Sequence, residues 1–189
     1  MFAADILIDG ERIRQIGCNL DVAADTTMSL AGKYILPGGI DAHTHLDMPL
    51  GDIRSCDDFE SGTIAAACGG TTTIVDYAAH AHGEPMEHGL EIWRQKADGK
   101  AVIDYGFHLS LSELTDRTLP DMARVMEAGV TSFKVFTAYP GRMMLDDGAI
   151  FKILRRAKEI GALICVHAEN GAVIDVLIHD ALAAGHVAP

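Results

Sequence analysis

Short apolar runs rich in β-branched residues alternate along this chain with longer segments of helical character. The apolar runs cover residues 34–45, 71–78, 102–111, 131–139 and 162–169. The helical segments cover residues 56–70, 86–100, 119–129 and 145–161, and three of them close on Gly and the second on Gly-Lys. Strands that alternate with helices in this way form βαβ units around a parallel sheet. We therefore expect an α/β fold.

A small β unit precedes this alternating region. Residues 4–17 alternate apolar and polar side chains around Asp9-Gly10, a dipeptide that favours a type I′ hairpin turn. A chain of 189 residues with 49% hydrophobic content is long enough to bury one sizeable core. We expect two regions, a small β-rich element at residues 1–32 and a larger α/β region at residues 33–189 that carries the functional motifs.

Composition excludes several classes of partner. The net charge of -12 opposes binding to nucleic acid or to an anionic membrane surface. We find neither a signal-peptide pattern at the start nor an apolar run of membrane-spanning length. The four cysteines are far apart and form no CxxC pair, so we expect packing thiols in a protein of the reducing cytoplasm. They are Cys18, Cys56, Cys68 and Cys165.

Polar residues occur where four of the five apolar runs should end or be interrupted. They are His43 and His45 in the first run, Asp76 in the second, Lys134 in the fourth and His167 in the fifth. No glycine-rich phosphate-binding motif follows any run, which disfavours a nucleotide-binding fold. In a (β/α)8 barrel the carboxyl ends of all strands converge on one site, so these residues would meet there. Five strands cannot close such a barrel, and we expect only its first part.

The densest group of polar residues lies in the stretch GGIDAHTHLDMP. His43 and His45 are flanked there by Asp41 and Asp47 at the same spacing of two residues, and in an extended strand all four side chains would point to one face. That arrangement is typical of a metal site. A lone histidine is more often a hydrogen-bonded core residue, and we assign that role to His80, His82, His88, His108, His179 and His186, with His108 the least clear.

Lys134 interrupts an apolar strand in TSFKVFTAY. A buried ammonium group is costly unless a partner or a change of protonation relieves it. One possibility is a carboxylate partner. The other is that the neutral amine has combined with carbon dioxide to form a carbamate, whose oxygens can bridge two divalent metal ions.

Four motifs together resemble those of the dihydropyrimidinase/D-hydantoinase family of cyclic amidohydrolases. The motifs are GGIDAHTHLDMP at residues 38–49, GGTTTIVDYA at 69–78, SFKVFTAY at 132–139 and VHAENG at 166–171. The resemblance runs from the first hairpin to the last residue. It implies the N-terminal part of a metal-dependent-hydrolase (β/α)8 barrel, with about five βα units preceded by a small β hairpin or sandwich element.

The resemblance also implies a set of site residues. His43 and His45 would bind the more buried of two zinc ions, carboxylated Lys134 would bridge both ions, and His167 would bind the more exposed one. Tyr139 would hydrogen-bond the substrate carbonyl oxygen as it gains charge. Asp76 and Glu169 are better placed to orient the metal ligands than to bind metal themselves, and a structural hydrogen-bonding role is the alternative for both. The pocket for the exocyclic group of the substrate would be lined by Met48, Leu50, Phe136 and Met143.

The implied reaction is hydrolytic opening of a hydantoin or dihydropyrimidine ring to an N-carbamoyl amino acid by a metal-activated hydroxide. Members of that family are more than twice as long as this chain and commonly form tetramers. We therefore expect a homo-oligomer whose open sheet edge favours self-association. We also expect this chain to lack a further histidine ligand and the aspartate that acts as general base, and to be inactive by itself.

Two alternatives remain. The first is a related amidohydrolase, an allantoinase or a dihydroorotase, which HTHLDMP and FKVFTAY fit less well. The second is a non-catalytic, self-associating relative on the same fold. Relatives of that kind lose metal ligands, whereas His43, His45, Lys134 and His167 are all present here.

Overall fold

The computed structural model describes residues 2–187, and the chain divides into two compact units, Met1–Pro37 and Gly38–Pro189. The change between the units falls at Pro37, later along the chain than the predicted boundary after residue 32. We retain as a proposal that the first region is a small β-rich element and that the second carries the function.

The first unit contains a β-hairpin of β1 (Asp5–Asp9) and β2 (Arg12–Gly17). Its turn consists of Gly10 and Glu11, and of these only Gly10 has a positive φ, of 58°. A type I′ turn needs positive φ at both central residues. The predicted type I′ turn centred on Asp9-Gly10 is therefore wrong, because the strands pair one residue later than the dipeptide suggests.

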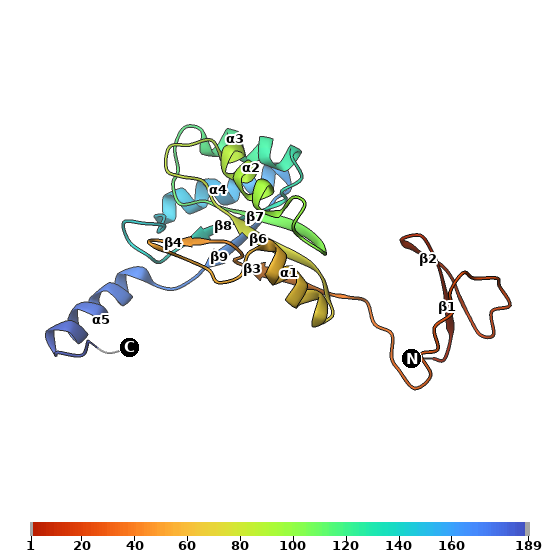
Figure 1. Cartoon of the computed structure of the whole chain (residues 1–189). Helices are drawn as coiled ribbons and strands as arrows, with labels where there is room; N and C mark the ends of the chain where they lie inside the picture. The colour runs from red at the N-terminus through yellow and green to blue at the C-terminus, as the bar shows by residue number, and fades with distance from the viewer. Residues whose placement is uncertain (1, 188–189) are drawn as a thin grey trace. The chain divides into compact units, whose positions relative to one another are not determined.

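The second unit is built on a parallel sheet of five strands that lie in sequence order (Figure 1). The strands are β3 (Gly39–Thr44), β6 (Thr71–Ala78), β7 (Asp104–Ser110), β8 (Ser132–Phe136) and β9 (Leu163–His167). A short antiparallel pair, β4 (Pro49–Leu50) and β5 (Ile53–Arg54), follows β3. The predicted α/β class is confirmed.

Five helices connect or follow these strands. They are α1 (Phe59–Cys68), α2 (Met86–Ala97), α3 (Thr118–Glu127), α4 (Asp147–Ile160) and α5 (Gly171–Ala183). The first four coincide with predicted helical segments, and local signals set their ends. Asp58 and Ser61 form a capping box at the start of α1, and Gly161, with a φ of 74°, ends α4 in the left-handed conformation. The fifth helix was not predicted.

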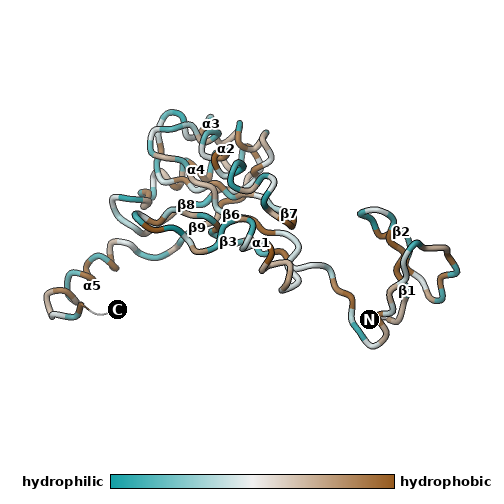
Figure 2. The backbone as a smooth tube through the Cα atoms, viewed as in Figure 1, coloured by the Kyte–Doolittle hydropathy of each residue, from teal (hydrophilic) through white to brown (hydrophobic). Residues whose placement is uncertain are grey.

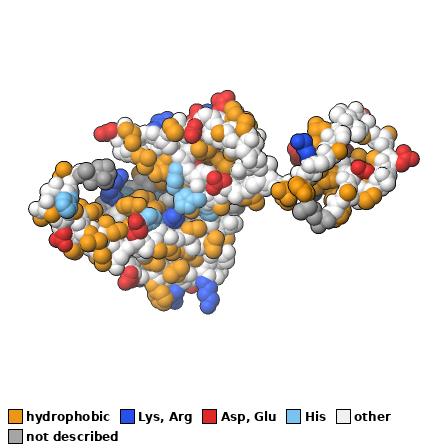
Figure 3. All heavy atoms as spheres, turned by 90° about the horizontal axis from the view of Figure 1, so that it is seen from below, with side chains coloured by type: hydrophobic (Ala, Val, Ile, Leu, Met, Phe, Trp, Pro, Cys, Tyr) orange, Lys and Arg blue, Asp and Glu red, His pale blue; other side chains and the backbone are white. Residues whose placement is uncertain are grey.

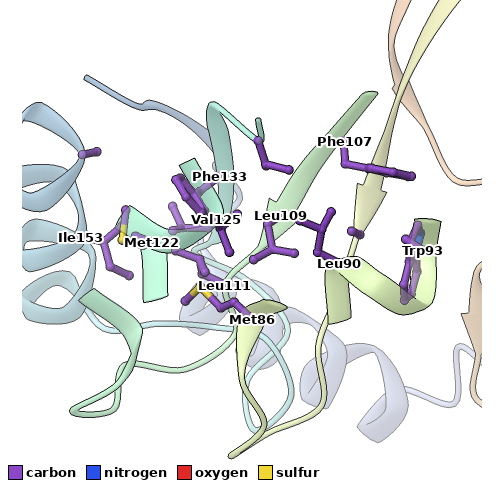
Figure 4. Close-up of a cluster of buried hydrophobic side chains, with 14 of the residues drawn as sticks. Met86, Leu90, Trp93, Phe107, Leu109, Leu111, Met122, Val125, Phe133 and Ile153 are labelled. Atoms are coloured by element: carbon purple, nitrogen blue, oxygen red, sulfur yellow. The ribbon is translucent and has the colours of Figure 1, made fainter. Parts of the chain in front are cut away.

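The hydrophobic core lies between the sheet and helices α2, α3 and α4, which lie together on one face of the sheet (Figures 1 and 4). Leu109 and Phe133 from the strands and Met122 and Ile153 from the helices are fully buried there. No helix in the described part of the chain is long and apolar enough to cross a membrane.

Apolar side chains are also exposed on β9, the last strand of the sheet along the chain, and on the helix that follows it. In β9, Leu163 and Val166 are exposed, and apolar residues recur along α5 (Figure 2). The cysteines differ from prediction: all four are free, but Cys18, Cys56 and Cys68 are exposed rather than packed, and only Cys165 is half-buried. The three exposed thiols lie outside the buried core, which apolar strand and helix residues fill.

Candidate metal centre and active site

Histidines gather on the face of the sheet opposite the helical layer (Figure 3). The phenol ring of Tyr77 in β6 is the centre of this group. Its centroid lies 4.6 Å from the ring of His43, 5.1 Å from that of His45 and 4.6 Å from that of His108. The Nζ atom of Lys134 lies 5.0 Å from the same ring. We call these five residues the Tyr77 cluster, and it brings three of the predicted ligands together.

His43 and His45 lie side by side at the end of β3. Their ring centroids are 5.1 Å apart, and neither side chain hydrogen-bonds another residue within the described chain. Partial burial, followed by the positive charge of Lys134, lowers the pKa of His43. Burial likewise lowers the pKa of His45, against the raising effect of Asp76. Both lowered pKa values favour the neutral imidazole, which is the form that binds metal ions.

The two aspartates that flank the histidines do not share their direction. The Asp41 carboxylate accepts a hydrogen bond from the backbone N–H of His43 at 3.1 Å. Asp47 pairs with Arg54 at 2.8 Å and has a φ of 49°. The prediction that both carboxylates join the histidines is wrong, because Asp41 is hydrogen-bonded to the backbone of His43 and Asp47 lies beyond the end of β3 at Thr44, where side-chain alternation has stopped.

Lys134 is buried in β8, with 8% of its surface exposed. No carboxylate lies within ion-pair distance of its Nζ atom among residues 2–187. Instead, the ammonium group faces the rings of Tyr77 at 5.0 Å and Phe136 at 5.6 Å. Of the two predicted explanations for this lysine, the carboxylate partner is therefore excluded in this structure.

A second group of rings lies beside the Tyr77 cluster, at the ends of β8 and β9. The His167 ring stacks on Phe136 with centroids 5.9 Å apart and lies 5.0 Å from Tyr139. Its Nε2 atom is 2.5 Å from Glu169 Oε2, so the carboxylate holds the imidazole. Tyr139 has a φ of 65°, a conformation that is strained for a bulky residue and often marks a functional site.

The predicted pocket residues are spread over several segments. Phe136 is buried beneath His167, whereas Leu50 in β4 is about half exposed. Met48 and Met143 lie in loops and are half-buried. The structure thus places Phe136 in direct contact with a predicted ligand, while the pocket role of the other three stays a prediction.

Asp76 in β6 points away from the histidines, into the layer between β3 and α2. Its buried carboxylate accepts hydrogen bonds from Thr44 Oγ1 at 2.8 Å, from the Leu46 N–H at 2.7 Å and from Trp93 Nε1 at 3.2 Å. Burial raises the pKa of this carboxyl group, and the hydrogen bonds oppose that rise. Asp76 therefore fixes the residues on both sides of His45 rather than contacting a ligand.

The cluster fits a metal site only if Lys134 takes part. Within residues 2–187, no three His, Cys, Asp or Glu side chains are grouped as metal ligands. His43 and His45 supply two neutral nitrogens, and Lys134, which has no acidic partner in the described chain, would supply oxygen donors as a carbamate. The donor set is then mixed nitrogen and oxygen, which suits a divalent ion such as zinc.

The chain was compared with known protein families. A sequence model of the amidohydrolase family matches residues 34–186. The chain belongs to the amidohydrolase family. D-hydantoinase from Geobacillus stearothermophilus is 54% identical to it in an alignment of 190 positions that covers 100% of this chain and 40% of that protein. D-hydantoinase from Streptomyces coelicolor is 47% identical over 98% of this chain and 41% of its own length.

Solved structures agree with this assignment. A crystal structure of D-hydantoinase superimposes with a TM-score of 0.96 at 53% identity, and dihydropyrimidinase from Brevibacillus agri with a TM-score of 0.96 at 50% identity. Each match covers 100% of this amidohydrolase chain and 41% of the other. The predicted family and the predicted barrel type, with five βα units, are confirmed. The chain spans about 40% of the length of these relatives.

Two members of the Tyr77 cluster, Tyr77 and His108, were not predicted from the sequence to lie at the functional site of this amidohydrolase. Burial and the neighbouring Cys165 thiol raise the pKa of Tyr77 to about 12, so the phenol is protonated at neutral pH. His108 is buried and hydrogen-bonded, as predicted, whereas the other five histidines given that role are exposed or half-buried. Tyr77 directly follows Asp76 in β6, so their side chains point to opposite faces of the sheet. This alternation was the feature of the sequence that could have placed Tyr77 beside the histidines.

The hydrogen bond from Trp93 to Asp76 can be tested separately. Trp93→Phe keeps most of the buried ring but removes the Nε1 donor, and we expect it to lower the free energy of unfolding by about 1–2 kcal/mol. Urea denaturation monitored by circular dichroism is the measurement. A free energy equal to that of the wild type would show that this bond contributes nothing to stability.

Proposed function

We propose that this chain forms the metal-binding part of an enzyme that hydrolyses cyclic amides. The reaction would open a hydantoin or dihydropyrimidine ring to an N-carbamoyl amino acid. The observation that supports it best is the convergence of His43, His45 and Lys134 on Tyr77, in a chain that is 54% identical to a D-hydantoinase. The proposed substrate is a small cyclic amide or imide.

Each site residue would have a separate role. His43 and His45 would hold the more buried of two zinc ions, Lys134 as a carbamate would bridge both, and His167 would hold the more exposed one. When bound, the ions would lower the pKa of water so that hydroxide is available at neutral pH. Glu169 is within hydrogen-bond distance of His167 and would orient it, as Asp76 does for the segment around His45.

Tyr139 would act on the substrate. Its ring lies 5.0 Å from that of His167, and nearly half of its surface is exposed. The phenol is therefore free to donate a hydrogen bond to the amide carbonyl oxygen as that oxygen gains negative charge. Phe136, beneath His167, would help to exclude water, and Met48, Leu50 and Met143 would shape the space for the exocyclic group.

Metal content and substrate choice test the proposal together. We expect elemental analysis of the purified chain to find zinc, and His43→Ala combined with His45→Ala to remove it. His88→Ala is the matched control, because His88 is exposed on α2 and outside the cluster. Zinc retained by the double variant would contradict the proposed ligands. Hydrolysis of allantoin or dihydroorotate in preference to hydantoin and dihydrouracil would favour an allantoinase or a dihydroorotase.

Tyr139→Phe tests the proposed hydrogen bond to the substrate. Because this chain is expected to be inactive by itself, the variant is compared with the wild type in an oligomer or longer form of the chain that hydrolyses hydantoin. There we expect kcat to fall about tenfold to hundredfold with zinc content unchanged, because a bound ion would share the charge of the same oxygen. The measurement is steady-state kinetics with metal analysis of the same sample. A kcat within twofold of the wild-type value would exclude Tyr139 from this role.

Two further features belong to the proposal. The exposed apolar residues of β9 and α5 support self-association, and we propose a homo-oligomer, with four subunits as the expected number. Four free cysteines suit a reducing compartment, so we place the protein in the cytoplasm.

A further inference from the structure

The backbone just before His43 departs from regular sheet pairing. Asp41 in β3 is paired with Ile74 in β6, and Thr44 with Asp76, so three steps along β3 match two along β6. Ala42 and His43 have no partner in this ladder. A bulge of this kind re-aims side chains, and it frees backbone groups that must find other partners.

His108 in β7 supplies the partner. Its Nε2 atom lies 3.0 Å from the carbonyl oxygen of Ala42, although β6 lies between the two strands. Its Nδ1 atom lies 2.5 Å from Ser132 Oγ in β8. A carbonyl oxygen can only accept, so Nε2–H donates to Ala42, and a neutral ring then accepts the Ser132 hydroxyl at Nδ1.

We infer that His108 is a positioning residue for the metal centre. It connects the carbonyl group next to His43 to the side chain two residues before Lys134, and its ring packs on Tyr77 at 4.6 Å. The resulting chain of contacts from β8 through β7 to β3 sets the spacing between the histidine pair and the lysine. This inference rests on the proposed function for the ligand roles of those residues.

Simple filling of space does not account for this side chain. His108 is 8% exposed, and burial of an imidazole is unfavourable unless both nitrogens are bonded. Both nitrogens are bonded here, and each partner lies one or two residues from a proposed ligand. An apolar ring would fill the same volume without that requirement.

Three variants separate the positioning role from packing. His108→Phe keeps the volume and removes both hydrogen bonds, His108→Gln keeps an amide donor that can reach the Ala42 carbonyl, and Ser132→Ala removes only the partner of Nδ1. His88→Phe is the matched control on the exposed face of α2. Circular dichroism establishes whether each variant is folded. If His108→Phe does not fold, His108→Gln and Ser132→Ala still test the inference.

The first measurement is long-range 1H–15N NMR of the imidazoles in the metal-free chain. We expect a neutral Nε2–H ring for His108, and shifted His43 and His45 signals in His108→Phe but not in His88→Phe. The second is zinc titration, where His108→Phe should weaken affinity at least tenfold and His108→Gln should restore most of it. Ser132→Ala should weaken affinity by a few fold.

The two measurements distinguish failure of the inference from failure of the proposed function. Unchanged His43 and His45 signals together with unchanged zinc affinity in His108→Phe would overturn the positioning role. Shifted His43 and His45 signals in His108→Phe, together with a wild-type chain that binds no zinc, would support positioning of the segment by His108 and contradict the proposed metal centre.

Discussion

Replacing Lys134 by Met is expected to abolish two-metal loading and to stabilise the metal-free chain. Methionine has nearly the same length but supplies neither an amine nor a carbamate, so no group remains to bridge two ions. Lys134 is buried against two aromatic rings with no carboxylate partner in the described chain. Removing its charge should therefore raise the free energy of unfolding by about 1–2 kcal/mol.

Both effects are measured on the same preparation, zinc by elemental analysis and stability by urea denaturation after chelation. Lys158→Met is the matched control, because Lys158 is exposed on α4. Two zinc ions per chain in Lys134→Met would exclude a bridging role. A large loss of stability would instead show that the ammonium group is held by favourable interactions with Tyr77 and Phe136.

Asp76→Ala is expected to lower the free energy of unfolding by about 3–5 kcal/mol. The substitution leaves three donors without their acceptor, namely the Thr44 hydroxyl, the Leu46 N–H and the Trp93 Nε1–H. Each unsatisfied buried donor costs about 1–3 kcal/mol, partly recovered where water enters. Zinc affinity should fall as well, since Thr44 and Leu46 flank His45.

Urea denaturation gives the change in stability, provided that the dependence on urea stays the same as in the wild type. Asp175→Ala is a suitable control, because its side chain is exposed on α5. The loss in Asp76→Asn should lie between those of Asp76→Ala and Asp175→Ala, since the amide oxygen can still accept from Thr44 and Leu46 while the amide NH2 faces the Trp93 Nε1–H donor. A loss below 1 kcal/mol in Asp76→Ala would show that the hydrogen bonds to this carboxylate do not stabilise the fold.

The order of strands and helices was predictable because its signals are local. Short apolar runs indicate strands, and Gly161 at the end of α4 or Asp58 at the start of α1 indicates a helix boundary. The fifth helix was missed because its amino-acid sequence shows no helical periodicity. Its residues are apolar around most of its circumference, so no periodicity of 3.6 marks it as a helix.

The composition of the site was only partly predictable. That His43, His45 and Lys134 meet follows from strand ends that converge. The direction of Asp47 does not, because it depends on β3 ending at Thr44, and the apolar surroundings of Lys134 depend on which residues of β6 and β8 face each other. The long-range contacts of His108 cannot be read from one strand, since its partners lie on β3 and β8.

The strictly sequential strand order has a consequence for synthesis on the ribosome. Each strand after β3 pairs with the strand of this sheet that precedes it in the chain, so a new βα unit can add to an edge that already exists. His43 emerges on the first strand and Lys134 on the fourth. The nascent chain must therefore hold its two histidines without their partner lysine until three more strands of the sheet have been added, and we expect the cluster to become competent for metal only after β8 has joined the sheet.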